Sequence, residues 1–412
     1  MSTATSNERI AVIDALRAFA LFGIIITHCA GAYLAGPPPS PDYNVFSPLD
    51  RVIGQLDDVL VFGKFFSIFA FLFGLSFAIQ MQNAERNAAA TGSSFSLRFA
   101  WRLLLLFAIG YVHGLFYSGD ILTIYAALGL LLIPWQRVST RAAAIVGVVL
   151  VLNLPGLVTN MASVVSPPSP AQMEADATGR ASFMERGRQQ YEIKRSGTVR
   201  ELFAINAAEA YATKFRFQVR TGRLWVTFGL FLLGLCAGRL MLFSDSEPHR
   251  QFFRRVAWLG GGVAAITSVV AIAYPVGMPV RDVATLLINF SFSVQQASLA
   301  AFYLAMVTLW FWRRPTRGVL PALVPMGRMG LTTYLTQSVF GIGLFYGIGL
   351  GLIGKIGLAA SIALGIAFFV AQVFVAKWWL RHFSMGPVEW LWRTLTYFKL
   401  QPLARPGAAA AG

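Results

Sequence analysis

Three side chains that could do chemistry stand inside one apolar run near the start of the chain. They are Asp14, Arg17 and His28, within the segment 9–31. A charged group near the centre of a bilayer costs about 3 kcal/mol on insertion scales, so each needs a partner. Asp14 and Arg17 are three residues apart, which predicts a neutralised pair on one helix face. Arg17 and His28 are eleven residues apart, nearly three turns, so they share a stripe and lie roughly 16 Å apart. We expect this stripe to face protein or water rather than lipid.

A second histidine and a carboxylate lie close together at the end of a later apolar run. They are His113 and Asp120, and the predicted helix directions place His113 at a depth similar to that of His28. A carboxylate can hold an imidazole in one tautomer with a pKa suited to general-base catalysis. We therefore expect His28, His113 and Asp120 to form an acid/base cluster. The alternative is that each histidine only makes a hydrogen bond between helices.

Arginines mark the opposite end of that run. Arg98 and Arg102 are four residues, about one helical turn, apart, and two guanidinium groups at this spacing suit a phosphate or pyrophosphate. Arg254, Arg255 and Arg328 enter from the same side and would extend the site. The alternative is that these side chains only extend to lipid headgroups.

Three further polar side chains interrupt apolar runs. Lys64 opens the second predicted span, and Thr333 and Gln337 lie one turn apart in the ninth. We expect them to line a substrate cavity. The alternatives are that Lys64 extends to the headgroups and that Thr333 and Gln337 join helices by hydrogen bonds. We expect no metal ion at any of these positions.

The chain that must position these groups is too apolar for a soluble globular protein of its length. Of 412 residues, 56% are hydrophobic and only 13% are charged, and the mean hydropathy is +0.61. These values predict an integral membrane protein that contacts lipids. The formal net charge is +16, but Lys and Arg are scattered between apolar runs rather than gathered on one polar domain, which argues against nucleic acid as a partner.

Ten apolar runs predict ten membrane-spanning helices in an all-α bundle. Their expected ranges are 10–34, 59–82, 99–118, 120–135, 140–163, 223–243, 256–275, 284–312, 328–348 and 357–380. Arginine collects in the loops on one side, which predicts that this side and both termini are cytoplasmic.

The span pattern divides the chain into four parts. Residues 1–163 form a first transmembrane bundle of about five spans, and 223–385 form a second. Between them, 164–222 is a hydrophilic extracytoplasmic insertion, in which 199–217 predicts an amphipathic helix on the membrane surface. The insertion could instead be a linker, or a lid over an outward cavity. Residues 386–412 are rich in Trp, Tyr and Arg at their start and predict an interfacial anchor and tail.

Three stretches of this sequence resemble a known family. RIAVIDALRAFALFGIIITH, LLLLFAIGYVHGLFYSGDILTIYAALGLLL and GPVEWLWRTLTY are similar to the YeiB family of bacterial membrane proteins, catalogued as domain of unknown function 418. That family is grouped with the transmembrane acyltransferases. The resemblance implies a protein of the bacterial inner membrane that transfers an acyl group, usually acetyl, from cytoplasmic acyl-CoA to a glycan or lipid-linked acceptor outside. Glycan acyltransferases typically carry a His after an Arg near the end of the first span, as His28 follows Arg17, whereas close YeiB relatives more often carry Asn there.

These observations support an acyltransferase hypothesis with named roles. His28 or His113 would act as general base or carry the acyl group, and Asp120 would orient the base. The residues expected to hold the anionic parts of acyl-CoA are Arg17, Arg98 and Arg102, with Asp14 fixing Arg17. A transporter or lipid-binding protein without covalent chemistry is the alternative, with the polar stripe lining a permeation path. Whether two copies form a homodimer is left open by the sequence.

Overall fold

The protein is an all-helical bundle in the ranges that the structure, a computed structural model, describes. These ranges are residues 5–40, 42–91, 95–166, 169–208, 210–274, 280 and 282–405. Extended pairing within them is an isolated bridge between Phe383 and Ala404. The end of the predicted tail, 406–412, lies outside the described residues.

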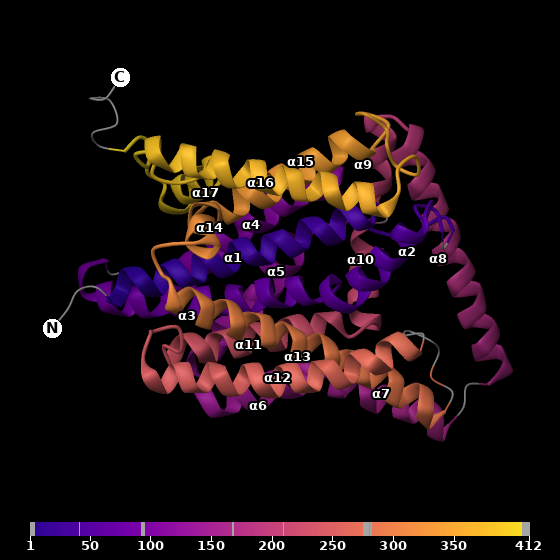
Figure 1. The fold of residues 1–412 in the computed structure, drawn as a ribbon, viewed down its shortest axis with the longest axis horizontal. Coiled ribbons are helices and arrows are strands. Elements are labelled where there is room, and N and C mark those ends of the chain that lie inside the picture. The colour runs from indigo at the N-terminus through magenta and orange to yellow at the C-terminus, as the bar shows by residue number, and fades with distance from the viewer. Residues whose placement is uncertain are drawn as a thin grey trace.

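Seven long helices are prominent in Figure 1: α1 (Thr5–Ala30), α3 (Lys64–Thr91), α4 (Phe95–Phe116), α8 (Pro170–Ser196), α12 (Glu247–Ala273), α13 (Val283–Arg313) and α16 (Leu358–His382). The shorter elements are α2 (Pro48–Leu56), the π-helical turn η1 (Asp57–Val61), α5 (Leu122–Leu132), the 3-10 turn η2 (Ile133–Arg137), α6 (Thr140–Val151), α7 (Leu154–Val165), α9 (Val199–Ala208), α10 (Ala210–Arg220), α11 (Arg223–Arg239), α14 (Val319–Arg328), α15 (Gly330–Phe345) and α17 (Pro387–Tyr397).

Six segments of the described chain are long and apolar enough to cross a membrane. They lie in α1, in α2 to α3 taken together, and in α4, α12, α13 and α16. The helices α6 and α7 make a seventh if they count as one span bent by 45°. The bend follows Asn153, which adopts a left-handed conformation with φ 52°, and precedes Pro155, which favours a helix start. The predicted ranges 120–135, 223–243 and 328–348 contain shorter helices, so the structure supports a helical membrane protein but does not confirm ten spans.

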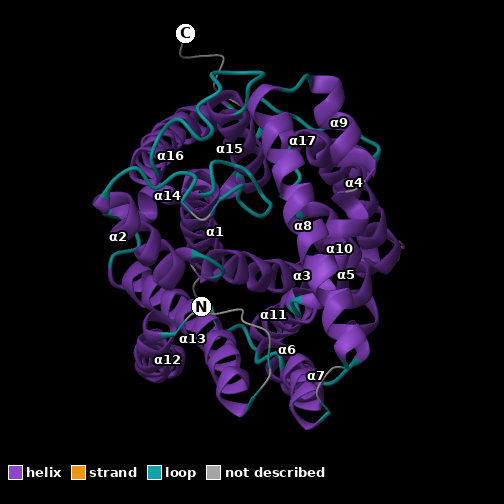
Figure 2. Cartoon of the chain, turned by 90° about the vertical axis from the view of Figure 1, so that its right-hand side faces the viewer, coloured by secondary structure: helices purple, strands orange, loops and turns teal. Residues whose placement is uncertain are grey.

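The polar first span lies at the centre of the bundle. Of the apolar stretch of α1, 72% is buried, against 11% in α12 on the periphery. Figures 1 and 2 show α1 surrounded by α3, α13, α14 and α16, all of which it contacts. Its polar side chains therefore meet protein on most sides.

Glycines allow the closest helix contacts in the core. A Cβ atom at Gly74 of α3 would clash with the backbone oxygen of Phe231, and one at Gly234 of α11 would clash with that of Phe71. The two helices therefore pack backbone against backbone. Small residues are the usual means of such packing between membrane helices.

The two ends of the bundle are different. Figure 1 shows that α1 begins, and α17 lies, at one end, and that α8 lies across the opposite end. We call these the terminal end and the α8 end.

The long polar helix α8 is fastened to the α8 end by a buried lysine. Lys194 is 1% exposed, and its Nζ donates hydrogen bonds to the backbone oxygen of Leu34 and, at 3.0 Å, to Ser118 Oγ. Burial lowers the pKa of Lys194 to about 7, because the charged form loses its hydration. Nearby, Gly187 of α8 packs against Pro37 so closely that a Cβ atom would clash with its ring.

The described residues of the predicted insertion 164–222 are mostly helical and include α8, α9 and α10. The helices α9 and α10 cover the range 199–217 apart from residue 209, which lies outside the described residues. Asn206 of α9 donates a hydrogen bond of 2.9 Å to the backbone oxygen of Leu115. The helix α9 therefore packs against the end of α4.

Candidate functional site

Two cavities lie between the helices and adjoin at mid-bundle. The proximal cavity, toward the terminal end, has a volume of about 280 Å³, and the distal cavity, toward the α8 end, about 630 Å³. Ile24, Phe66 and Ile121 line both cavities. These three side chains therefore mark the boundary between the cavities.

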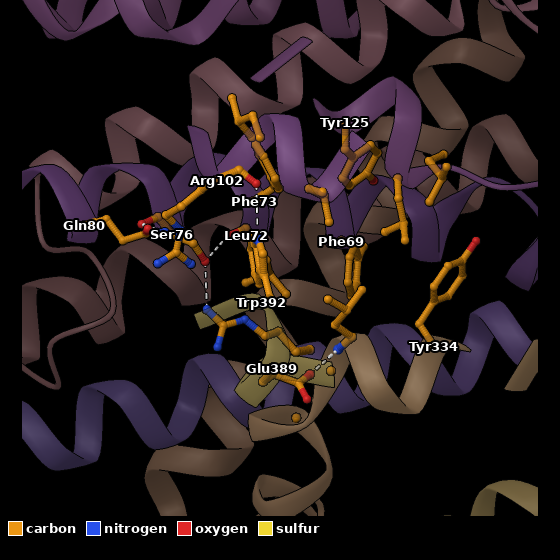
Figure 3. Close-up of a pocket in the computed structure, with 18 of the residues that line it drawn as sticks. Phe69, Leu72, Phe73, Ser76, Gln80, Arg102, Tyr125, Tyr334, Glu389 and Trp392 are labelled. Carbon is orange, nitrogen blue, oxygen red and sulfur yellow. Dashed lines mark hydrogen bonds between the residues drawn. The ribbon is translucent and has the colours of Figure 1, made fainter. Parts of the chain in front are cut away.

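Three arginines line the described part of the proximal cavity, and Arg17 and Arg102 are the two that the sequence assigned to the acyl-CoA donor. Arg17 of α1 bonds Asp14 at 2.5 Å and donates to Ser76 Oγ of α3 at 2.7 Å. Arg102 of α4 lies over the ring of Trp392, 4.5 Å from its centroid, and its backbone oxygen accepts from the Trp392 indole at 3.0 Å. Figure 3 shows Arg102, Ser76 and Trp392 grouped at one end of this cavity. The arrangement can bind an anion, because each guanidinium keeps further N–H donors.

Glu389 of α17 also lines the proximal cavity, and its role is visible from its partners (Figure 3). Its carboxylate accepts hydrogen bonds from the backbone N–H groups of Leu331 at 2.7 Å and Thr332 at 3.0 Å, and from the Thr332 hydroxyl at 2.5 Å. These groups belong to the first turn of α15, whose free N–H groups and dipole favour a carboxylate. Glu389 therefore holds α17 against α15 and closes one side of the cavity.

Two of the other predicted arginines lie away from this cavity. Arg98 does not line it, and its guanidinium is 5.7 Å from the ring centroid of Tyr397. Arg254 is exposed and pairs with Glu247 at 3.1 Å. By contrast, Arg328, which was expected to extend the anion site together with Arg254, does line the cavity.

The distal cavity gathers histidine, lysine and arginine from four helices and a loop. His28 comes from α1, Asp120 from the loop before α5, Arg186 from α8, Lys214 from α10 and Arg223 from α11. The Nδ1 atom of His28 is buried and has no hydrogen-bond partner among the described residues. His28 thus presents to the cavity an imidazole that is hydrogen-bonded to no described carboxylate.

Asp120 is the centre of a buried ionic network. It accepts hydrogen bonds from His113 Nδ1 at 3.0 Å, Lys214 Nζ at 3.1 Å, the N–H groups of Leu122 and Thr123 at 3.0 and 3.1 Å, and the Thr123 hydroxyl at 2.8 Å. The ammonium group of Lys214 and these converging donors favour the ionised carboxylate over the neutral acid. The carboxylate fixes Nδ1 of His113 as a donor and leaves Nε2, which is buried without a described partner.

The two histidines lie beside the same two tyrosines. The Tyr117 ring centroid is 5.2 Å from that of His28 and 5.8 Å from that of His113. The Tyr334 ring is 6.5 and 5.2 Å from the same two imidazoles. His28 lines the distal cavity, whereas His113 lines neither cavity in the part of the chain that is described. The structure therefore brings the predicted cluster together and presents His28 and Asp120, but not His113, to the distal cavity.

Lys64, Thr333 and Gln337 line neither cavity as described. Lys64 is fully buried and donates to the backbone oxygen of Asp58 at 2.7 Å. Gln337 donates to Gln372 at 3.1 Å, and Thr333 donates to a backbone oxygen of α14 at 3.4 Å. Their partners match the alternative named for Thr333 and Gln337, hydrogen bonding between helices. Within the described residues no group of His, Cys, Asp and Glu could hold a metal ion.

The sequence did not single out Lys214, Tyr334, Glu389 or Trp392. Glu389 carried a signal, since an acidic residue in an aromatic-rich helix at a membrane end needs a partner. The other three lie far apart in the sequence, and only the packing of the helices brings them to the cavities.

Apolar helices, buried ionic groups and cavities between the helices together define a polytopic helical membrane protein. The family model described as "Protein of unknown function (DUF418)" matches residues 237–399. The chain is 29% identical to "Uncharacterized protein YxaH" of Bacillus subtilis (strain 168), with 97% of both chains covered. It is 28% identical to "Uncharacterized protein YeiB" of Escherichia coli (strain K12), over 94% of this chain and 96% of that one. The match to DUF418 and the similarity to YeiB over most of the chain confirm the resemblance to the YeiB family seen in its motifs.

Proposed function

We propose that the protein is an acyltransferase of the bacterial inner membrane. It takes an acyl group, typically acetyl, from cytoplasmic acyl-CoA and transfers it to an extracytoplasmic glycan or lipid-linked acceptor. The observation that carries this proposal is the pair of adjoining cavities, with guanidinium groups in the proximal one and an imidazole in the distal one. We propose ten spans with the terminal end in the cytoplasm. The start of α1 and the helix α17 lie at the same end (Figure 1), as an even number of spans requires, and arginine-rich short loops favour the cytoplasmic side.

The donor would bind through its phosphates in the proximal cavity. Arg17 and Arg102 offer planar forks suited to phosphate oxygens, and the charge of Asp14 keeps Arg17 in place. From Arg17 to His28 the helix rises roughly 16 Å. An extended acyl-bearing arm would follow α1 over this length, past Ile24 at the boundary.

The transfer itself would take place beside His28. The acceptor oxygen or nitrogen attacks the thioester carbonyl, a new bond from that atom to the acyl carbon forms, and the carbon–sulfur bond breaks. His28 takes the proton from the acceptor and returns it to the leaving thiolate. The pair of His113 and Asp120 lies behind Tyr117 and fixes this wall of the site.

Single and double histidine variants test this assignment. With purified protein in lipid nanodiscs, labelled acetyl-CoA and membrane-extracted acceptors, His28→Gln is expected to lower the transfer rate by about 10²–10⁴, the usual contribution of a general base. His113→Gln is expected to lower it less, and the double variant to abolish it. His382→Gln is the control, because the His382 imidazole bonds the backbone oxygen of Trp378 at the other end of the bundle. Unchanged transfer in both single variants and the double variant would reject the mechanism.

A transporter or lipid-binding protein is the second candidate, because adjoining cavities along one helix also suit a permeation path. Stabilisation by acyl-CoA or slow hydrolysis of acyl-CoA by the purified protein favours the enzyme. Saturable solute uptake into vesicles without any response to acyl-CoA favours the transporter.

A further inference from the structure

Arg223 carries a positive charge in an aromatic cage at the distal cavity. Its guanidinium carbon lies 5.3, 5.2 and 5.8 Å from the ring centroids of Phe62, Phe66 and Phe217. Among the described residues, no carboxylate pairs with it and no side-chain or backbone oxygen accepts a hydrogen bond from it. A cation–π cage stabilises the charge and fixes its position, but it uses none of the five N–H donors.

Arg186 faces the same cavity from α8 and is also unsatisfied. Its Nε atom is buried and has no hydrogen-bond partner in the described part of the chain. No described carboxylate lies within ion-pair distance of it. Both side chains are half-buried. Because charged groups withdrawn from water are normally paired, two unpaired guanidinium groups on one cavity favour an anionic ligand there.

The cavity has too little negative charge of its own. Asp120 is the one acidic side chain among the described residues that line it, against Arg186, Lys214 and Arg223. That carboxylate is already used by Lys214, His113 and the first turn of α5. The imbalance therefore remains at the two arginines.

We infer that the distal cavity binds a phosphate-bearing molecule whose phosphate is held by Arg223 and Arg186. The guanidinium forks match phosphate oxygens in a bidentate way. The apolar part of the ligand rests on the aromatic wall, where Phe62 and Phe217 are 38% and 39% exposed at the rim. A phospholipid headgroup and a soluble phosphate ester share this chemistry.

This inference deepens the proposed function and, in naming the acceptor, rests on it. If the protein transfers acyl groups, the phosphate-bearing molecule is the acceptor, because His28 and both arginines line the same cavity. The acceptor then places its phosphate at Arg223 and presents its hydroxyl or amine to His28.

The test measures binding of two phosphate probes to the full-length protein in micelles of a phosphate-free maltoside detergent. One probe is soluble glycerol 1-phosphate, and the other is phosphatidylglycerol added to the micelle; uncharged glycerol is the blank. The variants are Arg223→Gln and Arg186→Gln. Arg188→Gln is the matched control, because Arg188 is an exposed residue of the same helix as Arg186 and does not line the cavity. Thermal melting checks that each variant is folded. Arg186 lies in α8, a surface helix outside the core, so its replacement should leave the fold intact.

We expect wild type and Arg188→Gln to bind a phosphate probe, and both Arg223→Gln and Arg186→Gln to bind it at least about tenfold more weakly, the usual effect of losing a charge-assisted bond. Binding of phosphatidylglycerol alone identifies a lipid headgroup as the ligand, and binding of glycerol 1-phosphate identifies a soluble ester. Failure of wild type to bind either probe, or equal binding by all four proteins, would overturn the inference.

The result is separable from the acyltransferase proposal. Phosphate binding that depends on Arg223 and Arg186, with no transfer by wild type, supports this site and rejects the enzyme. Acyl transfer with phosphate binding that is equal in all variants supports the enzyme and rejects this site.

Discussion

Replacing Asp120 by Asn should be the most damaging single change at the site. Asp120 is 1% exposed and accepts five hydrogen bonds from four residues. An amide has one acceptor oxygen and brings two N–H donors of its own, so it cannot satisfy these donors. Lys214 also loses the carboxylate with which it forms an ion pair. Breaking one partner of a buried ion pair costs about 3–5 kcal/mol.

A double-mutant cycle with Lys214→Met tests that reasoning. In Asp120→Asn/Lys214→Met the lysine charge is gone. The double variant should therefore lose about 2 kcal/mol less unfolding free energy than the sum of the losses in the two single variants, which is within the range found for directly coupled residues. Unfolding in mixed detergent micelles, followed by tryptophan fluorescence, measures all four proteins. Acyl transfer should stay low in the double variant, because His113 still lacks its carboxylate. Losses that add within about 0.5 kcal/mol, or an Asp120→Asn loss below about 1 kcal/mol, would refute the view that the pair is energetically coupled.

Two further changes test the packing and the α8 end. Gly234→Ala should destabilise the protein by about 1–3 kcal/mol, because its Cβ would clash with the backbone of α3. The control is Gly262→Ala in α12, where an added Cβ would meet no atom within 4 Å, so this change should be neutral or stabilising. Equal shifts of the melting temperature in the two variants would contradict the close packing of α3 and α11. The second concerns Lys194, whose pKa is about 7 in the folded protein against 10.5 for an ordinary solvated lysine. Between these two pKa values the unfolded chain binds more protons at Lys194 than the folded protein does. The free energy of unfolding should therefore rise as the pH increases from about 7 to 10, and fall again as the pH decreases. Lys194→Met should flatten that rise, as measured by unfolding or by hydrogen exchange in α8; the same slope in both proteins would exclude Lys194 as its origin.

Sequence spacing predicted the contacts that helix geometry decides. Asp14 and Arg17 pair because three residues bring side chains to one face. His113 and Asp120 meet because a helix end and a short turn separate them by only seven positions. In both cases the backbone between the two groups is local, so no knowledge of other helices is needed.

Contacts between distant segments could not be read in this way. Lys214 reaches Asp120 across 94 positions, and Trp392 bonds Arg102 across 290. The prediction also treated Gln337 as a wall of a cavity. A polar side chain in an apolar run satisfies the same sequence pattern whether it faces a cavity or a neighbouring helix, and only the partner, here Gln372, decides between them.

The same limit applies to the choice between the two histidines, and the structure supplies a physical reason to separate them. Both have a buried nitrogen without a described partner, and both lie beside the ring of Tyr117. Of the two, only His113 is paired with a carboxylate, and only His28 lines the distal cavity. A base that cannot reach the acceptor contributes nothing to proton transfer, because geometry comes before pKa in selecting the catalytic group. Within the proposed acyltransferase mechanism, His28 is therefore the better candidate for proton transfer, and His113 the better candidate for positioning the two tyrosines beside them.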